Sequence, residues 1–79
     1  MKEDQLQAES AASVDISSTD YTSQIGANLY VGTGGDVKVD MFKKGTVTFA
    51  NVQDGSYLPI KVTKVYKTGT TASDMLALW

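Results

Sequence analysis

The sequence predicts an all-β protein, a small antiparallel β-sandwich or barrel with an extended N-terminal arm. From residue 26 onward, short apolar segments alternate with turns rich in Gly, Asp and Lys, and no helical pattern lies between them. Residues 1–25 are instead rich in Ser, Thr, Gln and acidic side chains. A chain of 79 residues holds at most one small domain. We therefore expect an arm over residues 1–25 and a β domain over residues 26–79.

The expected arm has few strongly apolar side chains, and they show neither a strand period nor a helix period. We expect Val14, Ile16 and Tyr21 to anchor the arm to a larger partner. An extended arm of this length reaches up to about 80 Å. Deleting residues 1–20 is then expected to weaken attachment and to leave the β fold intact. A disordered tail is the alternative interpretation of the same composition.

Alternation of apolar and polar residues defines the first strands of the β domain. A short apolar run at residues 29–31 ends in a glycine-rich turn. Residues 37–41 and 46–52 then alternate with a period of two, which is typical of half-exposed strands. Gly with Lys, Asp, Ser or Thr forms the predicted turns, at residues 32–35, 43–45, 53–56 and 68–71.

Residues 57–67 form the longest predicted strand. Leu58, Ile60 and Val62 share one face, but the period slips after Thr63, which predicts a bulge near Thr63 and Lys64. Pro59 cannot donate a main-chain hydrogen bond, so we expect it on an edge or at a position outside the ladder.

The composition removes most catalytic and metal-binding chemistry. The chain has no Cys and no His, and its seven basic residues are all lysine. It therefore lacks a thiol nucleophile, an imidazole base, a Cys/His zinc site and an arginine clamp. A strand follows the glycine-rich segment 32–35, so we interpret that segment as a turn rather than a phosphate-binding loop. We expect no enzyme activity, no metal site and no cofactor.

Charge and hydropathy exclude two further classes of partner. The formal net charge of −2 argues against a nucleic-acid-binding surface. No apolar run approaches the length of about 18 residues that a membrane span needs. Residues 1–10 lack the apolar segment of a signal peptide, so we expect no passage through the Sec pathway on a signal of the chain's own.

The C-terminal segment has two apolar faces. Leu76 and Leu78 alternate with Met75, Ala77 and Trp79. A strand at the surface of a small domain buries one face, so another subunit is expected to cover the other. A chain of this size without disulfides also supplies only about 3–5 kcal/mol from its own core, which favours oligomerisation. We expect Met75, Leu76, Leu78 and Trp79 to mediate self-association.

Several blocks of the β domain, in one order, resemble a family of small virion proteins. The blocks read GANLYVGTGGDV at residues 26–37, TVTFANV at 46–52, GSYLPIKV at 55–62 and TGTTASDMLAL at 68–78. They are similar to the head-spike base and capsid decoration proteins of tailed phages and gene transfer agents. The resemblance covers about two thirds of the chain and is weak in the N-terminal part.

The resemblance implies a structural protein on the outer capsid surface of a virion, either a head-spike base or a cement protein, that is assembled in the host cytoplasm. The implied partners are the major capsid protein and further copies of this chain, in a trimer or pentamer matched to a capsid axis, with a spike fibre as another candidate. The alternative is a non-catalytic module that binds a glycan or peptide through an aromatic platform of Tyr30, Tyr57, Tyr66 and Trp79.

Overall fold

The computed structural model describes residues 8–79, which contain six β-strands and no helix. The strands are β1 (Ala11–Val14), β2 (Tyr21–Thr33), β3 (Gly35–Met41), β4 (Thr46–Val52), β5 (Ser56–Val65) and β6 (Ser73–Leu78). They form one sheet in the order β1-β6-β2-β5-β3-β4, and every pair of neighbours is antiparallel. The prediction of a small antiparallel all-β fold is confirmed.

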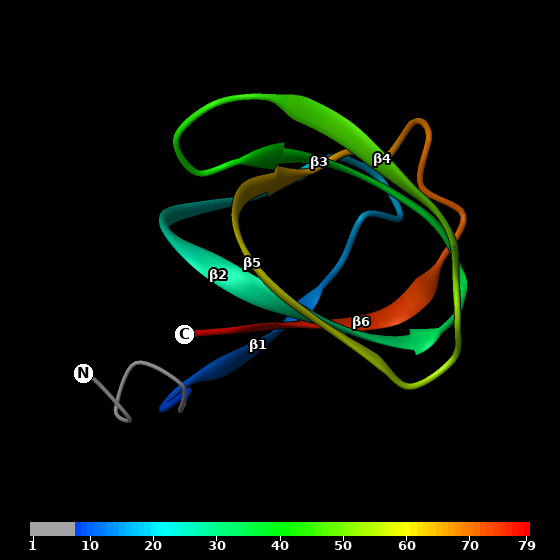
Figure 1. The fold of residues 1–79 in the computed structure, drawn as a ribbon, viewed down its shortest axis with the longest axis horizontal. Coiled ribbons are helices and arrows are strands. Elements are labelled where there is room, and N and C mark those ends of the chain that lie inside the picture. The colour runs from blue at the N-terminus through cyan, green and yellow to red at the C-terminus, as the bar shows by residue number, and fades with distance from the viewer. Residues whose placement is uncertain (1–7) are drawn as a thin grey trace.

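The sheet curls round on itself and encloses the core. Figure 1 shows β3 and β4 on one side of the curl and β1, β6 and β2 on the other, with β5 passing between them. β5 can join both sides because it pairs with β2 along one edge and with β3 along the other. The buried side chains therefore come from both halves of a single sheet rather than from two separate stacked sheets.

The segment before β6 nearly closes the curl into a barrel. The main-chain N–H of Thr71 donates to the Asp36 carbonyl over 2.8 Å. In return, the N–H groups of Asp36 and Lys38 donate to the hydroxyls of Thr71 and Thr70, each over 2.9 Å. The threonine hydroxyls thus stand in for the carbonyls of a regular ladder, and they satisfy main-chain donors of β3 where no strand covers them.

The core consists mainly of small and β-branched side chains. Its members are Val14, Ala27, Leu29, Val31, Val37, Val39, Val62, Val65, Ala72, Met75 and Ala77. Val62 and Val65 are both fully buried although they are three residues apart. Asp40 and Met41, adjacent on β3, pair with Lys64 and Val62, so Thr63 is the extra residue of a bulge. The predicted bulge is confirmed.

Residues 8–25 do not form a free arm, because β1 and the start of β2 belong to the sheet. β1 pairs with β6 over its whole length, and β2 begins at Tyr21, where it pairs with Val65 of β5. The expected boundary at residue 25 therefore falls inside a strand, and this prediction is corrected. The polar composition misled because an edge strand draws much of its stability from main-chain hydrogen bonds, which any sequence can form. Residues 1–7 of the expected arm lie outside the described residues.

Gly34, between β2 and β3, shows why the glycine-rich turn needs its glycines. A Cβ atom placed on Gly34 would lie 2.1 Å from the Val52 carbonyl oxygen, which is a main-chain clash. The Gly34 N–H donates to the Asp54 carboxylate over 2.6 Å, which joins this turn to the β4–β5 turn. Gly34 alone separates β2 from β3, so the connection is shorter than the turn predicted over residues 32–35, and a strand follows it as predicted. Glycine here lets two connections approach each other closely.

Candidate interaction surface

The two faces of β6 have different environments. Met75 and Ala77 are 2% and 0% exposed and point into the core. Leu76 and Leu78 are half-buried and lie on the outer face of the sheet, as the alternation along the strand requires. Met75 is therefore removed from the predicted set of self-association residues, because its side chain already fills the core of its own subunit.

Leu76 lies in an outward-facing row of apolar side chains that crosses three strands. It pairs with Tyr30 of β2, and Tyr30 pairs in turn with Tyr57 of β5. Tyr57 is 47% exposed, and its hydroxyl donates to the Asn28 side-chain carbonyl over 2.8 Å. Asn28 donates to the Ile60 carbonyl over 2.6 Å. These bonds hold Tyr57 over the sheet while its ring stays in contact with solvent.

A hollow next to this row is lined by Ile25, Gly26, Leu78 and Trp79, together with Asn28 and Lys61. Ile25 is 60% exposed and Trp79 is 39% exposed, so large apolar areas of both side chains contact solvent. Sequence reasoning missed Ile25. The signal that could have found it is its position beside a glycine in a strand, where a bulge redirects the neighbouring side chains.

Phe42 continues the apolar area on the far side of Lys61. The Lys61 ammonium lies 5.0 Å from the centroid of the Phe42 ring, within the range of a cation–π contact. Gly26, with φ of +80°, makes room for this arrangement, because a Cβ atom there would lie 2.5 Å from Lys61 Cγ and 2.9 Å from Phe42. Lys61 thus bridges Phe42 and the Ile25–Trp79 hollow.

We call this continuous set of side chains the outer patch. Its members are Ile25, Tyr30, Phe42, Tyr57, Leu76, Leu78 and Trp79. Contiguous exposed apolar and aromatic side chains are typical of surfaces that contact another protein. The sequence predicted Leu76, Leu78 and Trp79 here, and the fold adds aromatic residues from β2, β5 and the end of β3.

The three predicted anchoring residues do not form a free arm. Val14 is 8% exposed and belongs to the core. Ile16 and Tyr21 are partly buried and pack against that core. Their apolar side chains are already used in folding, so the prediction that they anchor the protein to a partner through an extended arm is corrected.

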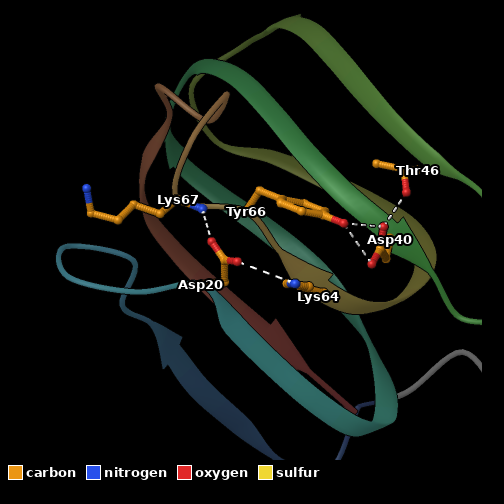
Figure 2. Close-up of polar contacts among 6 residues, drawn as sticks. All are labelled: Asp20, Asp40, Thr46, Lys64, Tyr66 and Lys67. Atoms are coloured by element: carbon orange, nitrogen blue, oxygen red, sulfur yellow. Dashed lines mark hydrogen bonds and ion pairs between the residues drawn. The ribbon is translucent and has the colours of Figure 1, made fainter.

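A polar cluster holds the N-terminal part against the rest of the sheet (Figure 2). The Asp20 carboxylate accepts the Lys67 main-chain N–H over 2.6 Å and lies 3.4 Å from the Lys64 ammonium. Asp40 accepts the Tyr66 hydroxyl over 2.9 Å and also accepts the Thr46 hydroxyl. Hydrogen bonds to an ionised carboxylate stabilise its charged form. This cluster links β3, β4 and the end of β5, and the isolated sequence gave no signal for it.

These bonds set the direction of two pKa shifts. The Lys67 N–H holds the pKa of Asp20 below its ordinary 3.8, with a smaller contribution from Lys64. The Thr46 hydroxyl, followed by the Tyr66 hydroxyl, does the same for Asp40. A carboxyl group whose pKa is lower in the folded state stabilises the fold above its unfolded pKa, and the stabilisation disappears as pH falls through the folded pKa.

We therefore expect the free energy of unfolding to fall as the pH drops below about 4, where carboxylates begin to be protonated in the unfolded chain. Urea unfolding at pH 7 and at pH 3 measures the effect. Asp40→Asn is the matched variant, and its deficit in stability relative to the natural chain should shrink at pH 3. An equal deficit at both pH values would contradict a role for the ionised carboxylate.

Within residues 8–79, no group of three or more acidic, His or Cys side chains is close enough to hold a metal ion. Tyr66 of the predicted aromatic platform lies apart from the outer patch. Its hydroxyl donates to Asp40, and the Lys38 and Lys64 ammonium groups lie 4.9 and 4.7 Å from the centroid of its ring. Residues 8–79 contain no helix with the length and apolar character needed to cross a membrane.

Comparison of the chain with protein-family models, with curated proteins and with solved structures finds no match.

Proposed function

We propose that this protein is a structural component of a phage virion, a head-spike base or decoration protein on the outer capsid surface, that acts through self-association and attachment to the major capsid protein. The observation that carries the proposal is the outer patch. A domain of 79 residues that leaves Ile25, Phe42, Tyr57 and Trp79 at least 39% exposed gains stability when a second surface covers them.

The chemistry of the patch favours adhesion over catalysis. Aromatic and aliphatic side chains are typical of the centre of a protein–protein contact, where burial supplies most of the binding energy. Lys61 and Asn28 add polar groups at its middle, which fix the orientation of a partner. The order of sequence blocks in residues 26–79 supports placing such a contact on a virion. The proposed assembly is a trimer or pentamer at a capsid axis, to which a spike fibre can also attach.

The proposal is tested with two side chains of the patch. Ile25→Ser combined with Trp79→Ser removes exposed apolar area and leaves the main-chain bonds of both residues in place. We expect the natural chain to form a trimer or pentamer at micromolar concentration in native mass spectrometry. The double variant should associate at least about tenfold more weakly, which is the effect of removing central aromatic contacts.

Ser18→Ala, in the exposed segment between β1 and β2, is the matched control and should leave the native mass unchanged. Binding of each variant to undecorated capsids, followed by cosedimentation, tests the virion role itself. A natural chain that stays monomeric and also fails to bind capsids would overturn the proposal.

One observation favours the alternative of a ligand-binding module. Tyr30 and Tyr57 lie side by side with Asn28 between them and the hollow, and aromatic rings next to amide groups suit a sugar or peptide ligand. A glycan array distinguishes the two functions, because an adhesive capsid protein is expected to bind no soluble glycan.

A further inference from the structure

The structure assigns a second, separate contact: we infer that β4 pairs with β4 of a second copy of this chain, antiparallel and about a two-fold axis through Thr48. This inference goes beyond the proposed function, because it uses the edge of the sheet rather than the outer patch. It also does not require a virion, so it can hold or fail independently of the proposed function.

β4 is an open edge strand without the usual protection. It is hydrogen-bonded to β3 on one side, and in the sheet formed by residues 8–79 no strand lies on its other side. Thr46–Val52 contains no charged residue and no proline, the two kinds of residue that commonly prevent edge pairing. Most of its side chains are exposed on both faces, and Val47 is 42% exposed. Main-chain groups and an apolar face are thus both available to a further strand.

The hydrogen bonds of β3 show which main-chain groups of β4 are free. Lys38 directs its N–H to Thr70 and its carbonyl to Tyr66, so both of its groups point away from β4. Val37 and Val39 therefore direct their groups toward β4, where they pair with Phe49 and Val47.

By the same alternation, the N–H and C=O groups of Thr46, Thr48 and Ala50 point to the open edge. The regular edge ends at Asn51, whose φ of 58° and bond to the Asp36 carboxylate take it out of the ladder. The free edge is therefore centred on Thr48.

The register centred on Thr48 makes this edge self-complementary. Thr48 then pairs with Thr48 of the second copy, and Thr46 pairs with Ala50, so all the outward main-chain groups find partners. Val47 of each copy lies opposite Phe49 of the other. Both side chains are on the core-facing side, because they pair with the buried residues Val39 and Val37. A β-branched residue opposite an aromatic residue is a favourable cross-strand pair.

Charge complementarity identifies the partner as another copy of the same edge. Lys43 and Lys44 precede β4, and Asp54 follows it. Antiparallel pairing about Thr48 places the lysines of each copy beside Val52–Asp54 of the other, so the two contacts bring opposite charges together at both ends. All three side chains are exposed. Among residues 8–79, the lysine that forms an ion pair with a carboxylate is Lys64, so neither Lys43 nor Lys44 forms one.

The other open edge, β1, is a poorer candidate for self-pairing. Its free groups are those of Ala11 and Ser13, because Ser10 exchanges both of its main-chain bonds with Trp79. Glu9 and Asp15 flank this short strand. Two copies of β1 paired through their free edges would place Glu9 of one opposite Asp15 of the other, and like charges in direct opposition destabilise strand pairing.

A single cysteine tests the inference directly, because the natural chain has no cysteine and any disulfide must join two copies. Residues opposite each other in a hydrogen-bonded antiparallel pair have Cα atoms about 5.5 Å apart, which suits a disulfide. We expect Thr48→Cys, oxidised with glutathione disulfide, to run as a covalent dimer on a non-reducing gel. Ala50→Cys is the matched control, since its two copies would lie about 13 Å apart and should stay unlinked.

Thr48→Pro is the complementary variant. The Thr48 N–H points to the open edge, so proline there removes no bond to β3 and should keep the fold. Loss of the β4 contact should separate any two outer-patch oligomers that it joins, so the native mass should fall to that of a single oligomer. Thr48→Lys is a second blocking variant with the same expected outcome if proline distorts the strand. Equal crosslinking of Thr48→Cys and Ala50→Cys, or an unchanged native mass in folded Thr48→Lys, would overturn the inference. The outer-patch variant leaves the Thr48→Cys crosslink intact, so the two contacts are tested separately.

Discussion

Replacing Val14 with Asp is expected to destabilise the fold by about 3 kcal/mol, from about 1.5 kcal/mol of lost apolar burial and a similar cost for placing a carboxyl in the core. Val14 pairs with Met75 of β6 and is 8% exposed. A chain of this length has about 3–5 kcal/mol from its core alone, so the variant should keep at most about 2 kcal/mol as a monomer. Circular dichroism and urea unfolding measure the effect.

Ser13→Asp is the matched control on the same strand. Ser13 is exposed and faces outward, so the added charge stays in solvent and should change stability by about 0.5 kcal/mol or less. If Val14→Asp were as stable as Ser13→Asp, residues 11–14 would not belong to the sheet. The composition predicted that deleting residues 1–20 preserves the fold. The structure predicts that this deletion destabilises the fold, because it removes β1 and Asp20.

Leu29→Ala is expected to have the second large effect, lowering the free energy of unfolding by about 2–5 kcal/mol. Leu29 is fully buried in β2 and lies between Ala77 of β6 and Leu58 of β5. Alanine leaves a cavity that the small side chains around it cannot fill, because β-branched and alanine side chains have little freedom to rearrange. Urea unfolding measures the effect: the midpoint should fall while the slope of the free energy against urea concentration stays unchanged.

Tyr30→Ala provides the control for Leu29→Ala, since the next residue along β2 faces the opposite side of the sheet. Tyr30 is 36% exposed, and the expected cost is about 1 kcal/mol or less from the lost contact with Tyr57. The two variants separate the core face from the outer patch. A larger loss in Tyr30→Ala than in Leu29→Ala would contradict the assignment of the two faces.

The outer patch and the β4 edge divide the surface between two kinds of contact. The patch offers side chains on a sheet face, whereas β4 offers main-chain groups along an edge. A contact through the sheet face buries side chains that the folded subunit already presents. A contact through the edge adds a strand to the sheet and extends its core. A protein with both can join copies in two independent directions, as the proposed role in assembly requires.

The sequence by itself determined the all-β class and the strands over residues 35–65. There the alternation is regular, and glycine with Asp or Lys marks the turns, so local pattern and local structure agree. It also indicated the bulge at Thr63, because a slip in an otherwise regular alternation has few other causes. The composition predicts adhesion rather than catalysis, because the chain has no His, Cys or Arg, and this stays a prediction.

Only the tertiary structure decided how the two ends of the chain are used. The alternation in β6 shows two apolar faces but does not say which one the rest of the protein covers, so Met75 could be separated from Leu76 only once the sheet had formed. The strand β1 has little apolar pattern, because an edge strand is held largely by main-chain hydrogen bonds to its neighbour. Long-range pairing of this kind depends on the whole sheet, and local sequence carries little trace of it.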